Sequence, residues 1–382
     1  MKTNIQIIDT TEGFEALRND WDRLLHNAAS ASVFSSWEWQ YHWWLHYGKC
    51  RALRLLVVRN DRDEILGILP LYIQSVTFLR FVPLSMLRLV GTGGDTSPDY
   101  MGPLLEPATE QDTCLSLSQF ILEKLNGWDA LDFTDMPGDS VFAKTLADQA
   151  GRIGLRYDNH AISSIPIIRL PATWEDYLSS LHRDQRYRVR KMRRKIIEAF
   201  TVKFHVWESH DRLDEVIDSL IALHHLRWQQ HVKQSSAFAS PAYISFHRDT
   251  IKACFRRGWI RIYCLTLNDR IAAIYYCYRF RNEIFYFQSG FDPAFEDYVP
   301  GQVLLGYAVE DAINEGNKVF DLLKGQYRYK TEWANDSRKT RDLSAYHANF
   351  RTKLYLIRRK YLPAMKAAAK SLLRSTGLMR TP

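Results

Sequence analysis

The stretch WIRIYCLTLNDRIAAIYYCYRFRNEIFYFQS, from Trp259 to Ser289, decides the fold of this chain. It contains three runs rich in β-branched and aromatic residues, the composition that strands favour. These runs are Trp259–Thr266, Ile271–Phe280 and Glu283–Ser289. The polar triplet Asn268-Asp269-Arg270 between the first two predicts a hairpin. A helix over Gln302–Glu315 and a strand over Lys318–Leu323 are expected next, which predicts a crossover after the antiparallel strands.

Two helices are expected before this stretch. Six side chains fall on one helical face: Leu213, Val216, Ile217, Leu220, His224 and Trp228. A second helix is predicted over Ala242–Arg256. Helices followed by antiparallel strands and a crossover indicate an α/β (α+β) fold, in which a mixed, mostly antiparallel sheet is flanked by helices.

The first half of the chain repeats this order. The expected elements are helices over Glu12–Ala28 and Ser36–Tyr47, strands over Leu53–Arg59, Ile65–Ile73 and Leu84–Val90, a helix over Gln111–Leu125 and a strand over Ala130–Thr134. A unit of this size that occurs twice indicates duplication. We therefore expect one domain over residues 1–160 and a second over 161–350. A linker region over Leu155–Phe200 joins them, with a basic helical part over 172–200, and residues 351–382 form a basic helical tail.

Length and composition fit two folded domains in a reducing compartment. The chain has 382 residues, 46% of them hydrophobic, and a chain of this length commonly forms two cores. Its five cysteines are odd in number and lack a CxxC spacing, so neither a disulfide framework nor a metal site is expected. The N-terminus has no signal-peptide pattern, and no apolar run is long enough to span a bilayer. The predicted location is cytoplasmic, with peripheral binding to the inner face of the membrane as an open alternative.

Positive charge is concentrated in two segments. Arg183–Lys195 carries eight basic residues and one acid, which suits either an anion contact or a solvated helix. Residues 351–382 carry nine basic residues and no acid, so the net charge of +8 leaves −1 for the remainder. In this tail Leu354, Ile357, Tyr361 and Met365 have helical spacing. The tail is expected to dock on the body of the protein, and an anionic membrane surface is the alternative.

Two glycine-containing segments were considered as phosphate sites. Gly91-Thr92-Gly93-Gly94-Asp95 is interpreted as a turn, because no helix follows it. Pro300-Gly301 lies beside the start of the helix after the third strand, where free N–H groups and the helix dipole favour a pyrophosphate.

Five motifs in the same order resemble the CelD-like branch of the GNAT acetyltransferases, which is related to the Fem-type transferases with two GNAT-like halves. The motifs are Val33–Trp39 with Trp43-Trp44, Leu223–Trp228, Phe287–Asp292, Pro300-Gly301, and Phe320–Gly325 with Tyr329-Lys330. The resemblance covers roughly residues 30–350. It implies two tandem GNAT-like domains, of which the second is catalytic and the first is not.

The resemblance also implies a reaction and a site. Acyl-CoA, commonly acetyl-CoA, donates its acyl group to a small-molecule primary amine, such as an amino sugar of polysaccharide biosynthesis, and no metal takes part. The cofactor-binding residues are Gln288, Ser289, Pro300, Gly301, Gln302 and Val303. The catalytic residues are His224 as base, Asp321, and Tyr329 as acid, and the substrate-binding residues are Trp228, Asp292 and Lys330.

Each of these roles has a structural alternative. His224 and Asp321 suit a buried, hydrogen-bonded position, Asp292 suits an Asx turn, and Tyr329-Lys330 suits a surface loop. One departure concerns the donor: Tyr298 and Val303 stand where the family has a basic residue or Gln and a second small residue. Two other functions therefore remain open. One is a Fem-like transferase that uses aminoacyl-tRNA, the only nucleic acid expected as a partner, and the other is a non-catalytic protein of polysaccharide assembly.

Overall fold

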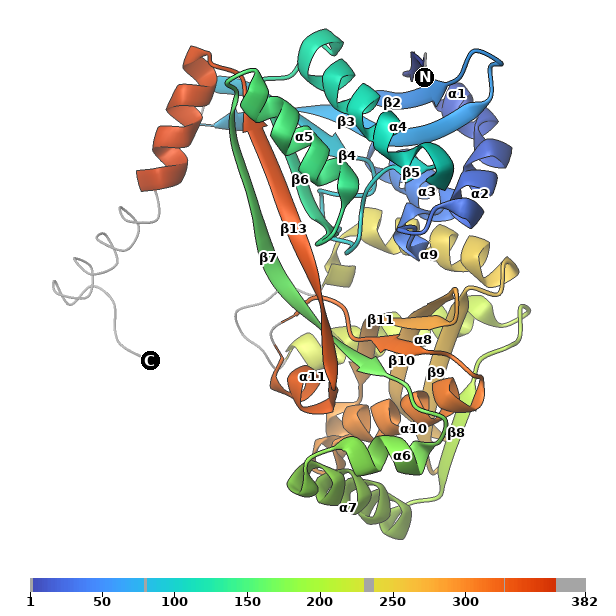
Figure 1. The fold of residues 1–382 in the computed structure, drawn as a ribbon. Helices are drawn as coiled ribbons and strands as arrows, with labels where there is room; N and C mark the ends of the chain where they lie inside the picture. Colours follow the sequence, from blue (N-terminus) through green and yellow to red (C-terminus); the bar gives the residue numbers. More distant parts are fainter. Residues whose placement is uncertain (1–2, 79–80, 230–236, 326, 362–382) are drawn as a thin grey trace, which may run out of the picture.

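A computed structural model describes residues 3–78, 81–229, 237–325 and 327–361, without the side chains of 161, 162 and 229. Within these residues the strands form one 13-stranded sheet that runs through both halves of the chain (Figure 1). The sheet is mostly antiparallel and helices cover its faces, which confirms the fold class expected from the sequence.

The first half contains the predicted helices and strands in the predicted order, together with elements that the sequence did not predict, among them the strands Asn4–Ile8 and Leu104–Leu105 and the helix Val141–Arg152. Its bounds are β1 Asn4–Ile8, α1 Thr11–Ala16, α2 Arg18–Asn27, η1 Val33–Ser35, α3 Trp37–Tyr47, β2 Arg51–Arg59, β3 Ile65–Phe78, β4 Val82–Leu89, β5 Leu104–Leu105, η2 Pro107–Thr109, α4 Glu110–Gln119, η3 Phe120–Lys124, β6 Ala130–Pro137 and α5 Val141–Arg152. The single helix expected over Glu12–Ala28 is divided at Leu17, which caps α1 and precedes α2.

The second half repeats the order after a connecting segment. The connection is β7 Arg156–Arg169, α6 Trp174–Ser180 and α7 Arg183–Ala199. Then follow β8 Val202–Val206, α8 Leu213–Gln229, η4 Ala237–Ala239, α9 Pro241–Arg256, β9 Ile260–Leu267, β10 Arg270–Phe280, β11 Glu283–Phe291, η5 Pro293–Tyr298, α10 Pro300–Asn314, β12 Val319–Asp321, α11 Arg328–Trp333 and β13 Asp336–Tyr346.

The two halves share a pair of long strands. β13, from the end of the second half, lies between β6 and β7, and β7 lies between β13 and β12. The β7–β13 register extends from Arg156↔Tyr346 to Ile167↔Asp336, and both strands cross the space between the halves in Figure 1. Residues 156–169, expected as linker, therefore form part of the sheet of both halves. Their partner strand lies far along the chain, so the local pattern does not reveal the pairing.

The Trp-rich helix α3 fills the contact between the halves. Trp39 is fully buried and its ring lies 4.9 Å from Phe246 and 5.5 Å from Phe287, both of the second half. His247 is also buried in this contact, and both of its ring nitrogens lack a hydrogen-bond partner among the described residues. Burial lowers the pKa of His247 to about 3, so the imidazole is neutral and packs as an aromatic ring.

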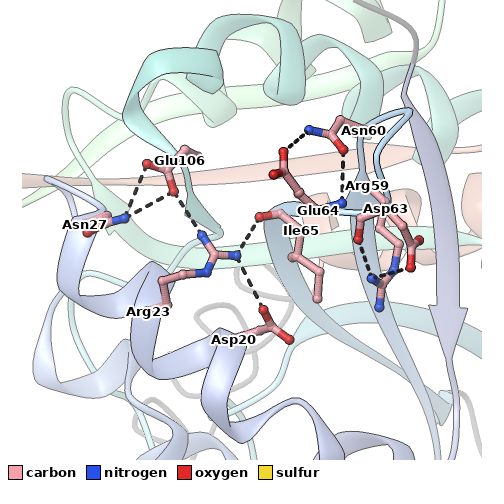
Figure 2. Close-up of polar contacts among 9 residues, drawn as sticks. All are labelled: Asp20, Arg23, Asn27, Arg59, Asn60, Asp63, Glu64, Ile65 and Glu106. Atoms are coloured by element: carbon pink, nitrogen blue, oxygen red, sulfur yellow. Dashed lines mark hydrogen bonds and ion pairs between the residues drawn. The ribbon is translucent and has the colours of Figure 1, made fainter.

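Polar contacts hold α2 and the turn between β2 and β3 in the first half (Figure 2). The guanidinium of Arg23 on α2 donates to the carbonyl of Ile65 at 2.7 Å and to Glu106 at 3.2 Å. Asn60 organises the turn between β2 and β3, because its Oδ1 accepts from the backbone of Glu64 at 3.0 Å. The hydrogen bonds of Arg23 join α2 to the sheet. Those of Asn60 confirm the turn expected after Arg59.

The described part of the tail is a helix over residues 350–361, which lies at the end of β13 (Figure 1). Met365 and the other tail residues beyond 361 lie outside the described part. None of the helices in the described ranges has the length and apolarity needed to cross a membrane.

Candidate functional site

β11 and β12 part after a short parallel contact. They pair only at Glu283↔Val319, Ile284↔Phe320 and Phe285↔Asp321, while β11 continues to Phe291 along β10. In the described residues, the last six residues of β11 therefore have a strand on one side only. The register with β10 also shifts at Phe287, where β11 carries an extra residue. A bulge beside an unpaired strand edge leaves backbone polar groups available to a ligand.

Helix α8 packs on one face of the sheet, over the free part of β11. An added Cβ on Gly290 would be 2.6 Å from the backbone nitrogen of His224, so only glycine allows this approach. The approach brings His224 and Trp228 beside Gln288. The Trp228 indole donates to His224 Nε2 at 3.1 Å, and Gln288 is a second partner of the imidazole. Burial and the Arg227 charge lower the pKa of His224 to about 4, so it is neutral at pH 7.

Arg227 is the cation at the free edge of β11. Its Nη1 donates to Ser289 Oγ at 2.8 Å. The guanidinium carbon also lies 5.8 Å from the ring centre of Phe291 and 5.9 Å from that of Tyr327. Half-buried among aromatic rings, this guanidinium suits an anion or a polarised carbonyl oxygen.

The start of α10 is open but has few free donors. Val299 is the N-cap, with φ +46°, and its side chain makes no capping hydrogen bond. Its carbonyl accepts from the backbone of Gln302 at 2.9 Å and of Val303 at 3.2 Å, and Pro300 has no N–H. Space is available, because the nearest atom to an added Cβ on Gly301 is the Tyr275 hydroxyl at 4.0 Å.

A lysine of α7 lies near the start of α10. The Lys195 ammonium lies 4.8 Å from the ring centre of Tyr298 and donates to the Asp297 carbonyl at 2.8 Å. A lysine from another helix therefore supplies a cation beside Tyr298.

Asp292 lies at the end of β11 and has structural partners. Its Oδ1 accepts from the backbone of Ala294 at 3.0 Å and caps η5, and its Oδ2 forms an ion pair with Arg270.

The side chains of Tyr329 and Lys330 differ in the number of hydrogen bonds that they donate to described residues. The Tyr329 hydroxyl donates to that of Tyr286 at 3.4 Å, and burial raises its pKa, so the phenol is protonated. Lys330 is buried and donates to the carbonyls of Leu322, Leu323 and Lys324, at 2.6, 3.2 and 3.0 Å. Burial lowers its pKa to about 8. Lys330 therefore fixes the segment between β12 and α11.

Asp321 is the residue of β12 at which the pairing with β11 ends, and its side chain lies in a polar cluster between the halves. Its Oδ1 accepts from the backbone of Leu323 at 2.8 Å, and its Oδ2 accepts from the Tyr100 hydroxyl at 2.8 Å. Arg338 lies 3.4 Å from Oδ2 and binds both oxygens of Glu283 at 2.6 Å. Complete burial raises the pKa of Asp321 to about 6.

The same cluster contains Asp99, a residue that the sequence did not single out. Its Oδ2 accepts from the backbone of Lys324 at 2.9 Å, while its Oδ1 is buried with no hydrogen-bond partner in the described residues. Burial, together with Asp135 and Asp321, raises its pKa to about 7. The Lys324 ammonium instead binds Asp135, at 2.8 Å to each oxygen. No group of three or more His, Cys, Asp or Glu side chains in the described ranges is arranged to hold a metal ion.

The structure thus brings the predicted residues together as two groups. His224, Trp228, Gln288 and Ser289 surround the free edge of β11, and Asp321 lies in the cluster between the halves. Sequence reasoning missed Arg227, Asp99 and Lys324 as site residues, although Arg227 and Lys324 stand inside recognised motifs and Asp99 follows the Gly-rich turn.

Comparison with known proteins gives a family match over part of the chain. Residues 183–331 match the acetyltransferase (GNAT) domain family. A search of curated proteins finds no match.

Solved structures similar to the chain share its fold over nearly their whole length. FemX aligns with a TM-score of 0.61 at 11% identity, covering 94% of this chain and 99% of FemX. A conserved protein of unknown function from Bacteroides thetaiotaomicron gives 0.54 at 9% identity, with 90% and 100% covered. L-PGS from Bacillus licheniformis gives 0.53 at 11% identity, with 89% and 96% covered. At these identities the likeness concerns the fold. The chain therefore has the overall fold of these structures, and residues 183–331 in its second half match the acetyltransferase (GNAT) domain.

Proposed function

We propose that this protein is an N-acyltransferase that moves an acyl group, commonly acetyl, from acyl-CoA to a small primary amine. The observation that carries the proposal is the parting of β11 from β12 after three residue pairs. It leaves an unpaired strand edge that points toward the open start of α10. An extended pantetheine arm pairs with such an edge, and the thioester carbonyl then lies beside backbone N–H groups that stabilise an oxyanion.

The side chains around the edge supply the remaining parts. Arg227 and Ser289 polarise the carbonyl, and Lys195 with the start of α10 faces the pyrophosphate. The amine attacks the thioester carbon, and Tyr329, protonated because its pKa is raised, donates a proton to the leaving thiolate. We assign the acceptance of the amine proton to Asp99, since both oxygens of Asp321 and the imidazole of His224 already have hydrogen-bond partners. His224 then positions Gln288.

The test is release of free thiol from acetyl-CoA in the presence of amino sugars and amino acids, followed with a thiol reagent. Tyr329→Phe should lower kcat by about a hundredfold, the size of a typical general-acid contribution. The matched control is Tyr327→Phe on the same segment. Amine-dependent thiol release that is unaffected by Tyr329→Phe would contradict the assigned role, and no release with any amine would contradict the reaction.

A second candidate is transfer from aminoacyl-tRNA. It is favoured by the scarcity of donors at the start of α10 and by the exposed basic surface of α7. Three basic residues of α7 have acidic partners, in the pairs Arg188–Glu332, Arg190–Glu175 and Arg193–Glu310. Others, such as Arg183 and Arg194, are exposed. If tRNA is the donor, its binding weakens steeply with salt and acetyl-CoA has no effect.

An amino sugar is proposed as the acceptor because of the resemblance to the CelD-like branch. The thiol-release assay with amino sugars and amino acids identifies which amine is used. The non-catalytic alternative in polysaccharide assembly predicts that neither donor binds. It also predicts that Tyr329→Phe leaves the cellular phenotype unchanged.

A further inference from the structure

The helix over residues 350–361 packs on the body with one face. Thr352 is 1% exposed, and the Tyr355 ring meets Phe78 of β3 edge-on at 5.7 Å. Arg359 donates to the Tyr346 hydroxyl, and Leu356 packs on the same small core. Positions 352, 355, 356 and 359 lie on one side of a helix with about 100° per residue, so this side is the docked face.

The opposite side of the helix is an exposed apolar stripe. Phe350 is 75% exposed, Ile357 55% and Tyr361 52%. Leu354 is half-buried and packs on the small core under the helix. A protein surface rarely leaves three large apolar side chains of one helix in water unless the surface binds something.

Basic residues border the stripe on both sides. By the same helical geometry, Arg351 and Arg358 lie on one flank and Lys353 and Lys360 on the other. Arg351 lies 3.6 Å from Asp129, whereas Lys353 and Arg358 form no ion pair with any described residue. An apolar stripe between two rows of cations matches the interface of a bilayer, where apolar groups enter the acyl region and cations meet lipid phosphates.

The neighbouring hairpin has an exposed aromatic residue as well. Phe81, between β3 and β4, is 84% exposed. Phe78 and Val82 on either side of it belong to the core under the helix, so Phe81 lies at the same end of the molecule.

We propose that the outward face of the 350–361 helix, with Phe350, Ile357 and Tyr361 between its flanking cations, binds the surface of a bilayer that contains anionic lipid. A second copy of the chain fits this face poorly, because it would oppose one set of cations with another in a protein of net charge +8. A nucleic acid would use the cations but leave the apolar stripe in water. The proposal is independent of the acyl-transfer reaction.

The test is co-sedimentation of the full chain with vesicles of phosphatidylcholine alone or mixed with phosphatidylglycerol. We expect binding to the mixed vesicles, weakened by salt. The double variant Ile357→Ser with Tyr361→Ser should bind at least about tenfold more weakly, because it removes apolar area from the membrane-facing side. Lys353→Gln with Lys360→Gln should weaken binding to the mixed vesicles in particular.

Two matched controls separate the face from general surface effects. Ile153→Ser changes an apolar residue that is 49% exposed elsewhere, and Lys49→Gln with Arg62→Gln removes the same charge from other exposed positions. Both controls should bind vesicles like the original protein. Unchanged binding of the Ile357→Ser/Tyr361→Ser variant would overturn the proposal, as would no vesicle binding at low salt. Dimers in light scattering that this variant abolishes, or RNA binding in place of vesicle binding, would also overturn it.

Discussion

The hydroxyl of Tyr100 in the first half donates a 2.8 Å hydrogen bond to Oδ2 of Asp321 in the second half. The two residues are 221 positions apart, and Asp321 is fully buried. Through this bond, a side chain of the first half is a hydrogen-bond partner of a buried carboxylate in the second half. Together with the shared β7–β13 pair, it indicates that the first half is structurally required by the site even if it binds no donor.

Removing this hydroxyl should weaken the fold. In Tyr100→Phe the buried Asp321 loses a donor, and we expect the free energy of unfolding to fall by about 1–3 kcal/mol. Urea denaturation measures the change. Tyr41→Phe, which removes a solvent-exposed hydroxyl bond to Glu15, should stay within about 0.5 kcal/mol. Equal stability of Tyr100→Phe and the original protein would show that the bond is not formed.

Two glycines at the site should differ in their tolerance of the same change. Gly290→Ala forces a Cβ to 2.6 Å from the His224 backbone, and we expect a loss of about 1–3 kcal/mol as α8 moves. Gly301→Ala meets its nearest atom at 4.0 Å and should be nearly neutral. Thermal unfolding of the two variants side by side checks the close packing of α8 on β11, which a tolerated Gly290→Ala would contradict.

The buried His247 should make the protein sensitive to acid. Its folded pKa of about 3 lies below its ordinary value of 6.5, so between these values the unfolded chain binds more protons. Stability from this residue is therefore present above about pH 6.5 and is lost as the pH falls. His247→Phe removes both the proton uptake and two unsatisfied nitrogens.

We expect His247→Phe to be more stable than the original protein at pH 7 by about 1 kcal/mol. Its advantage should grow by up to about 1.4 kcal/mol per pH unit below 6.5. Asp99 and Asp321 have raised pKa values and act in the opposite direction, but they are present in both proteins and cancel in the difference. Denaturation at pH 7 and pH 5 gives that difference, and a constant value would contradict a neutral buried imidazole.

Asp99 should govern the pH dependence of turnover. Its pKa of about 7 means that the carboxylate able to accept a proton forms as the pH rises through neutrality. We expect kcat/KM for acetyl-CoA and an amine to rise to a plateau above about pH 7. Asp99→Asn should lower it about a hundredfold or more and remove the inflection. A variant that keeps the same inflection would assign it to another group, such as the amine itself.

Much of the second half was predictable, because its signals are local. The β-branched and aromatic composition of Ile271–Phe280 and the triplet Asn268–Arg270 lead to β9 and β10 without knowledge of any distant residue. Pro300 likewise marks the first residue of α10, since proline suits the first turn of a helix.

The strand exchange and the cluster between the halves depend on distant contacts. β7 was expected as linker because its partner β13 begins 167 residues after the end of β7, at Asp336. Asp99 joins Lys324 across 225 positions, and no local pattern marks that pairing. The roles expected for Gln288 and Ser289 follow from the motif that contains them. The contact of Arg227 with Ser289 is known only from the packing of α8 on Gly290.

Donor binding is the most direct measurement of the central claim, that the free edge of β11 and the start of α10 hold acyl-CoA. Thermal unfolding is recorded with acetyl-CoA for the original protein, Gly301→Ala and Gly301→Leu. We predict stabilisation of about 2.7 kcal/mol at a hundredfold excess over the dissociation constant, retained in Gly301→Ala and lost in Gly301→Leu, whose side chain fills the donor space. Stabilisation that persists in Gly301→Leu, or none in the original protein, would contradict the claim.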